Sequence, residues 1–182
     1  MNTTLTACLI AMKAFTWPDP SQWPGLPECT LAEIAKVFTV VADGGRGSGY
    51  IGEEHRNLLW LSASGGGFPD SIRVWLDGDK VAMLDTPVRS RPEELKALVT
   101  KLGEPVAKLD AYFHNALLEE SEWVYPERGL TLFIEPETRV LLRLTAYPRT
   151  NLAEYQRRFR FMGGQTIKHI RDWHEAPIGT GQ

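Results

Sequence analysis

The sequence predicts an α+β fold built from two sequential repeats, each a helix followed by an antiparallel sheet, with a C-terminal helix after them. One observation is a pair of helix-start signals, TLAE at residues 30–33 and SRPE at residues 90–93. In each, the hydroxyl side chain can accept a hydrogen bond from the third helical N–H, and the glutamate can reach back to the cap. The other observation is a pair of strand–turn–strand patterns, at residues 72–84 and 130–144. A helix and a hairpin therefore recur in the same order in each half.

The length and composition of the chain agree with this organisation. Its 182 residues are 43% hydrophobic and 24% charged, an ordinary balance for a globular protein that can bury a core. We place the first repeat, with an N-terminal extension, at residues 1–88, and the second repeat, with the C-terminal helix, at residues 89–182. A single sheet in which the two patterns are alike only by accident is the alternative.

The first half reads as a helix, a short strand and a hairpin. After TLAE, apolar residues recur at helical spacing, which predicts a helix over residues 31–39. A short apolar strand is expected at residues 58–61. Alternation of side chains then leads to Asp77-Gly78, a strong signal for a tight hairpin turn. The return strand is expected at residues 80–84.

The stretch GSGYIG at residues 47–52 fits G-x-G-x-x-G, the loop that cradles a dinucleotide pyrophosphate. Such a loop must follow a buried strand and open a helix. Here a capped helix comes before it, and a short apolar strand that ends in three glycines comes after it. We therefore predict no nucleotide site and expect a flexible glycine-rich connection over residues 43–52.

The second half repeats the order of the first. A helix after SRPE should end at Gly103, because glycine commonly follows the last helical turn. An aromatic strand is expected at residues 122–125, and a hairpin of two strands at residues 130–136 and 139–144. A last helix should start near Asn151, which can cap it.

Net charge, the apolar N-terminal run and the cysteine content limit the predicted cellular location and partners of the protein. The net charge is −3, so no basic field attracts nucleic acid. The apolar run over residues 5–12 is too short to cross a membrane, and no basic residue precedes it as in a signal peptide. We expect a cytoplasmic protein that binds neither nucleic acid nor membrane. For Cys8 and Cys29, the only cysteines, one bridge is possible, but a reduced pair suits that location better.

No catalytic, cofactor or metal motif fits its structural context. The sequence has no H-E-x-x-H metal motif, and Gly47-Ser48-Gly49 lacks the frame of a serine nucleophile elbow. We therefore expect no catalytic residue, no cofactor and no metal. One alternative is a hydrolase that uses His55 or His114 with a nearby glutamate, and another is a metal site made of His55, His114 and Glu53.

The stretch LGEP at residues 102–105, which ends a capped helix before a run of strands, resembles a recurring bacterial unit. It is similar to the repeat of the β-lactamase inhibitor proteins, which carry two tandem copies of a helix followed by four strands. The resemblance implies that fold and an inhibitory role, although the paired cysteines usual in that family are missing. WVYPERGL at residues 123–130 looks like stretches of uncharacterised bacterial proteins.

These observations predict a non-catalytic protein-binding module, of the inhibitor or immunity type, that neutralises a toxin or enzyme. Tryptophan and tyrosine are the usual anchors of protein interfaces, and several fall on the expected strands. Acidic residues cluster over residues 119–127 and could speed the encounter with a basic partner. The expected contact residues are Trp60, Trp75, Tyr112, Glu119, Glu120, Glu122, Trp123 and Tyr125.

Overall fold

The computed structural model describes residues 3–41, 45–113 and 116–160. The helices are α1 (Thr3–Ala14), α2 (Leu31–Ile34), α3 (Pro92–Leu102) and α4 (Leu152–Arg158), with a 3-10 turn at Pro126–Arg128. The strands are β1 (Thr39–Val40), β2 (Arg46–Ile51), β3 (Arg56–Ser64), β4 (Ile72–Asp77), β5 (Lys80–Pro87), β6 (Ala107–Phe113), β7 (Ala116–Tyr125), β8 (Leu130–Glu135) and β9 (Val140–Ala146).

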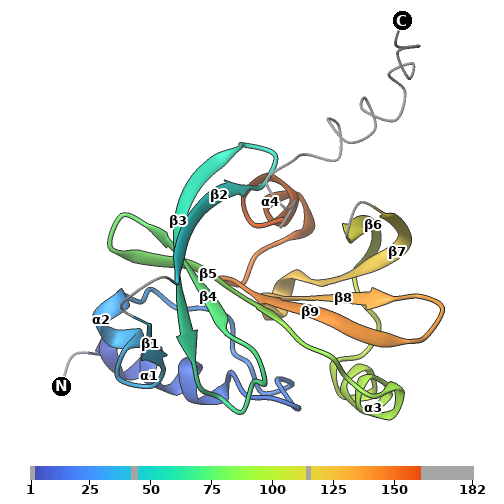
Figure 1. Ribbon diagram of the computed structural model, residues 1–182, viewed down its shortest axis with the longest axis horizontal. Helices are drawn as coiled ribbons and strands as arrows, with labels where there is room; N and C mark the ends of the chain where they lie inside the picture. Colours follow the sequence, from blue (N-terminus) through green and yellow to red (C-terminus); the bar gives the residue numbers. More distant parts are fainter. Residues whose placement is uncertain (1–2, 42–44, 114–115, 161–182) are drawn as a thin grey trace, which may run out of the picture.

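Within the described residues the strands form one nine-stranded sheet in the order β1-β3-β4-β5-β9-β8-β7-β6 (Figure 1). β2 also pairs with β3, on the same edge as β1. Every pair is antiparallel, and pairing between β5 and β9 joins the two halves of the chain. The α+β class with a large antiparallel sheet is therefore confirmed. The division into two repeats is not confirmed, and the boundary at residues 88–89 stays a prediction.

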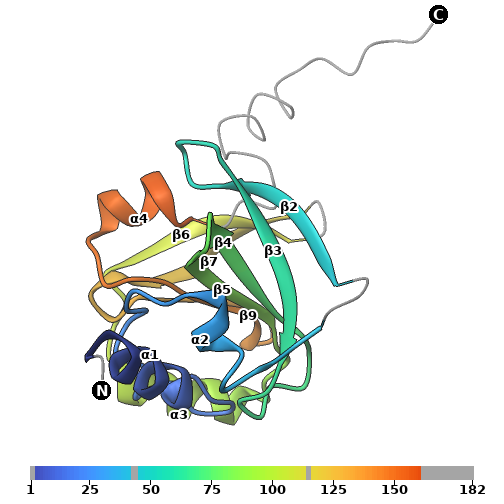
Figure 2. The same ribbon diagram turned by 90° about the vertical axis from the view of Figure 1, so that its left-hand side faces the viewer.

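Helices cover both faces of the sheet. Figure 2 shows α1, α2 and α3 on one side and α4 on the other. In α1, buried Cys8, Ala11 and Met12 fall at helical spacing, and α3 buries Leu95 and Leu98 in the same way. These residues share one core with the sheet. A second core lies between the opposite face and α4.

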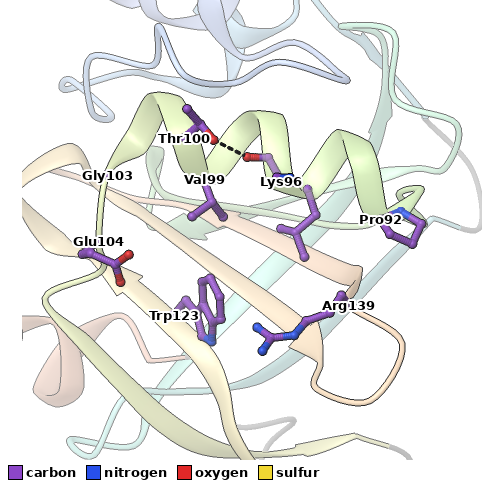
Figure 3. Close-up of a pocket in the computed structure, with 9 residues that line it drawn as sticks. Pro92, Lys96, Val99, Thr100, Gly103, Glu104, Trp123 and Arg139 are labelled. Atoms are coloured by element: carbon purple, nitrogen blue, oxygen red, sulfur yellow. Dashed lines mark hydrogen bonds between the residues drawn. The ribbon is translucent and has the colours of Figure 1, made fainter.

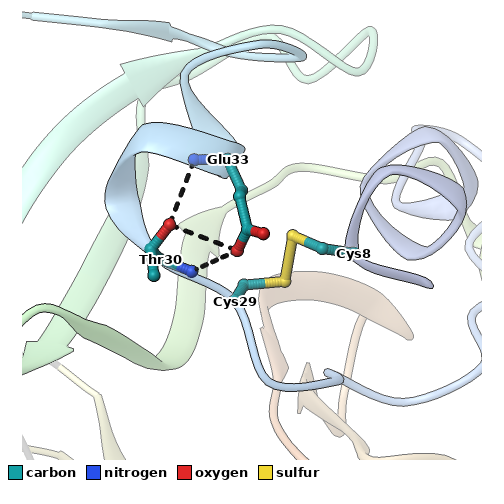
Figure 4. The surroundings of a disulfide bond; sticks show 4 residues. All are labelled: Cys8, Cys29, Thr30 and Glu33. Carbon is teal, nitrogen blue, oxygen red and sulfur yellow. Dashed lines mark hydrogen bonds between the residues drawn. A yellow bond between two sulfur atoms is a disulfide. The ribbon is translucent and has the colours of Figure 1, made fainter. Parts of the chain in front are cut away.

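The first capping box is confirmed, but the helix after it is shorter than expected. The backbone N–H of Thr30 donates to Glu33 Oε2 at 2.8 Å, and the backbone N–H of Glu33 donates to Thr30 Oγ1 at 3.4 Å (Figure 4). α2 then ends at Ile34, whereas the sequence predicted a helix over residues 31–39. A turn replaces its second half because the chain enters β1 at Thr39.

The second predicted capping box, of Ser90 and Glu93, does not form. Arg91 is the N-cap, and its backbone N–H donates to Glu94 Oε2 at 2.8 Å, but the arginine side chain has no acceptor for the return bond of a capping box. The Ser90 hydroxyl instead accepts a hydrogen bond at 2.9 Å from the backbone N–H of Leu141 in β9. The Ser90 side chain, which the local pattern predicted to cap the helix, therefore makes a tertiary hydrogen bond to β9 instead.

The glycine-rich stretch is a strand, so the prediction of a flexible connection is wrong for it. Residues 46–51 form β2 and pair with β3 from Arg46↔Leu61 to Ile51↔Arg56. A strand that continues into a hairpin cannot form a dinucleotide loop, which opens a helix. The predicted hairpin at Asp77-Gly78 is confirmed, because β4 and β5 pair directly on either side of it.

Cys8 and Cys29 form a disulfide (Figure 4), so the expectation of a reduced pair is wrong. Both are fully buried, and the bond ties α1 to the segment before α2. Disulfides are typical of proteins in oxidising compartments, so this bond argues against a cytoplasmic location. The cytoplasmic location stays a prediction. Among the described residues, every helix is too short or too polar to cross a membrane.

Candidate functional site

The Trp60 and Trp75 side chains lie on the face of the sheet that carries the second core, and their rings pack over the glycines of β2. They are register partners on β3 and β4, with ring centroids 6.4 Å apart. Gly47 lies opposite Trp60, and a Cβ atom there would be 2.6 Å from the indole. A Cβ at Gly49 would be 3.1 Å from the Trp75 ring. The alternating glycines of β2 therefore make room for the tryptophan rings, and Trp75 is only 3% exposed.

Beside the tryptophans, a buried aspartate lies between two arginines. Asp85 Oδ2 is 3.4 Å from Arg73 Nη1, and Asp85 Oδ1 is 3.3 Å from Arg143 Nε. Burial raises the pKa of Asp85 above its ordinary value, although the two arginines oppose this. Burial also lowers the pKa of Arg143. The loss of hydration on burial is the main cause of both shifts, and such a cost accompanies every buried ion pair.

Glu122 is a second buried carboxylate, so it is not part of an exposed acidic loop. Its side chain accepts a hydrogen bond from the Tyr155 hydroxyl at 2.6 Å, and both Nε and Nη2 of Arg160 donate to it. Burial raises the pKa of Glu122, and Arg160 opposes this shift. The residue ties β7 to α4 and the segment after it, and 1% of it is exposed.

Trp123 and Tyr125, also predicted as contact residues, belong to the first core. The Trp123 indole N–H donates to Glu120 O at 2.8 Å, and the Tyr125 hydroxyl donates to Gly103 O at 3.1 Å. Both side chains are less than one-tenth exposed. Their polar atoms are therefore satisfied inside the protein, which leaves little of either ring for a partner.

Two of the predicted residues are exposed, and both lie on the β6–β7 hairpin together with the half-buried Tyr112. Glu119 and Glu120 are exposed, and Tyr112 is half-buried. Glu120 has a positive φ of 50°, at a bulge where its backbone N–H donates to Asp110 Oδ1. Leu117, at the same end of the hairpin, is 44% exposed. This hairpin therefore presents acidic and apolar groups together.

A more apolar exposed surface lies on β2, β3 and β4, and we call it the outer patch: Tyr50, Leu59, Leu61 and Leu76. Leu59 is 65% exposed and Tyr50 is 47% exposed. Leu61 and Leu76 flank Leu59 and are half-buried. The face continues the one that α1 and α2 cover, but those helices lie at the other end of β3 (Figure 1). No strand pairs with the outer edge of β2 in the part of the chain that the structure describes.

Sequence reasoning missed the outer patch because residues 58–61 are all apolar. Neighbouring residues of a strand point to opposite faces, but an all-apolar run does not show which face is buried. Trp60 was chosen for its residue type, whereas Leu59 is the exposed neighbour. The spacing of Gly47 and Gly49 could have shown which face is buried. Glycines at alternate positions of a strand leave room for large side chains of the neighbouring strand on that face.

The alternative hydrolase site is not assembled by the described residues. His55 lies in the β2–β3 turn with a φ of 52°, and its ring is edge-to-face with Tyr50. Glu53 is exposed in the same turn, and His114 lies outside the described residues. No group of three or more histidine, cysteine, aspartate or glutamate side chains that could hold a metal occurs in the ranges that the structure covers.

Comparison with known proteins found no relative. No protein-family model matches the chain, and no curated protein or solved structure matches it significantly.

Proposed function

We propose that the chain is a non-catalytic protein-binding module of the inhibitor or immunity type, and that it contacts its partner through the outer patch. The observation that carries the proposal is the exposure of Leu59, a leucine in mid-strand that is 65% exposed. Contiguous exposed apolar patches on soluble proteins often mark sites where a partner binds.

The geometry of β2 and β3 suits a protein partner. Tyr50, which lies diagonally across the β2–β3 pair from Leu59, supplies an aromatic anchor, and tyrosine is enriched among the residues that dominate binding energy. The outer edge of β2 has no strand partner within the described residues. An extended segment of a partner can therefore pair with β2, and its side chains can lie over the outer patch.

The partner that we propose is basic, such as a cationic toxin or enzyme. Glu119 and Glu120 are exposed on the β6–β7 hairpin and make no ion pair with the described residues. Exposed charges of this kind act mainly on the rate of encounter. Reversal of both, Glu119→Lys with Glu120→Lys, should slow association and weaken its dependence on salt. An unchanged association rate would exclude the hairpin and leave the outer patch as the contact.

The test is affinity capture from the native host at low salt with three baits: the wild type, Leu59→Lys and Val106→Lys. Val106 is a matched control, because it is a 60% exposed apolar residue outside the outer patch. A specific partner should be retained by the wild type and by Val106→Lys, and lost with Leu59→Lys. With purified partner, the loss for Leu59→Lys should be about 30-fold in Kd, the effect of removing an interface anchor.

Deletion of the gene in the native host tests the immunity role separately. Deletion should expose toxicity from a neighbouring gene product. If capture finds no partner and deletion has no effect, the proposal is wrong. If a captured partner binds both lysine variants equally well, binding does not use the outer patch.

A further inference from the structure

A pocket of about 620 Å³ lies between α3, β7 and the β8–β9 turn (Figure 3), and it shares no lining residue with the outer patch. Its apolar wall is formed by Leu95 and Val99 of α3 and by Trp123 of β7. This volume is in the range of small-molecule sites, which are mostly apolar with a few polar groups that orient the ligand. The Trp123 N–H is already bonded to Glu120 O, and 9% of the residue is exposed, so the accessible part of the ring can offer a ligand only apolar contact.

The charges around the pocket are unequal. Lys96 and Arg139 line it, both are exposed, and neither forms an ion pair with any described residue. Lys108 lies above the Trp123 ring, with Nζ 4.5 Å from the centroid. Glu104 is the acidic residue of the lining, and Figure 3 shows it on the other side of Trp123 from Arg139. The lining therefore holds two cations, Lys96 and Arg139, against one carboxylate.

Arg139 occupies a backbone position that favours glycine. Its φ is 56°, in the left-handed region, at the end of the β8–β9 turn where its N–H donates to Glu135 O. An arginine there costs stability that a glycine would restore. Its guanidinium points toward Trp123 (Figure 3). A strained residue that directs a cation into a pocket is the kind of departure that marks functional sites.

We propose that this pocket binds a small carboxylate with an apolar, preferably aromatic, body. The body lies against Trp123, Val99 and Leu95, and the carboxylate lies between Arg139 and Lys96. A neutral ligand would leave these cations unpaired, and a cationic ligand would be repelled by them. The pocket is separate from the outer patch, so this proposal does not rest on the protein-binding function.

Three probes with the same body separate the contributions: 4-phenylbutyrate, 4-phenylbutanol and 4-phenylbutylamine. Binding to the full chain is followed by NMR at the indole N–H signal of Trp123, which Trp123→Phe identifies. The carboxylate should bind at millimolar concentration, about fivefold more tightly than the alcohol, with the amine weakest.

The variants are Arg139→Gly and Lys96→Gln, with Lys36→Gln as a control for loss of an exposed lysine elsewhere. Arg139→Gly should raise the melting temperature by about 2–4 °C, because it relieves the strained φ. The same variant should bind the carboxylate and the alcohol with Kd values within about twofold. A more stable protein that binds less selectively cannot be explained by misfolding.

Lys96→Gln should weaken the preference for the carboxylate in part, and Lys36→Gln should leave it unchanged. The proposal is overturned if the alcohol binds the wild type as tightly as the carboxylate does. It is also overturned if Arg139→Gly keeps the preference, or if no probe moves the Trp123 signal.

Discussion

Asp85 and Glu122 are buried carboxylates, and arginines accompany both. Glu122 has the better geometry, because two nitrogens of Arg160 and the Tyr155 hydroxyl donate to it. Asp85 is held at longer distances by Arg73 and Arg143. Removal of one member of such a cluster leaves an uncompensated charge, so we regard both as structural.

The raised pKa of Asp85 predicts how Asp85→Asn changes the dependence of stability on pH. An acid whose pKa rises on folding contributes stability below its unfolded-state pKa, and that contribution is lost as pH rises through the folded-state pKa. The free energy of unfolding of the wild type, relative to Asp85→Asn, should therefore fall as pH rises from the ordinary value of 3.8 toward neutral.

Chemical denaturation of both proteins at a series of pH values measures this difference. A difference that is constant or that rises with pH would show that Arg73 and Arg143 outweigh the effect of burial.

At the scale of elements, β2 depends on the glycines that face the tryptophans. Gly47→Ala should destabilise the protein by about 1–3 kcal/mol, because the new Cβ would lie 2.6 Å from the Trp60 ring and would force it to move. Ser48→Ala, at an exposed position of the same strand, should change stability by less than about 0.5 kcal/mol. Urea denaturation of the two variants tests this, and equal effects would contradict the close approach.

The disulfide connects α1 to the segment before α2, across a separation of 21 residues. A loop of this length implies that the bond contributes about 3 kcal/mol, through restriction of the unfolded chain. Reduction should therefore lower the melting temperature of the wild type, and should not affect the Cys8→Ser/Cys29→Ser double variant. Two reactive thiols in the unreduced, unfolded protein would show that the bond does not form.

At the scale of the whole molecule, β5 and β9 join the two halves in the middle of the sheet. Leu84 pairs with Ala146 and Thr86 with Leu144, and the first core takes residues from both halves. Neither half can bury its share of that core without the other.

We therefore predict that residues 1–88 and 89–182, expressed separately, do not fold alone. Each fragment should lack a cooperative thermal transition in circular dichroism, and mixing should restore one. A fragment that unfolds cooperatively by itself would instead support an independent repeat.

Much of the fold was predictable from local signals, because those signals act between residues that are close in the chain. The Thr30–Glu33 capping box, the hairpin at Asp77-Gly78 and the end of α3 before Gly103 occur as expected. A local prediction fails where a residue far away in the chain forms a hydrogen bond with the same side chain. Ser90 is the example, since its hydroxyl accepts from the Leu141 N–H and Arg91 is the N-cap of α3 instead.

The candidate site was much less predictable, because it depends on which face of each strand is covered. Residue type suggested Trp60, Trp75, Glu122, Trp123 and Tyr125 as contacts, and all five are half-buried or buried.

The sequence by itself determined the α+β class and the antiparallel hairpins, because spacing and turn chemistry specify local structure. The tertiary structure decided the β5–β9 pairing, the disulfide, the burial of Glu122 and the exposure of Leu59. Each of these depends on contacts between segments that are far apart in the chain. Such contacts do not produce a periodic pattern in the sequence of either segment.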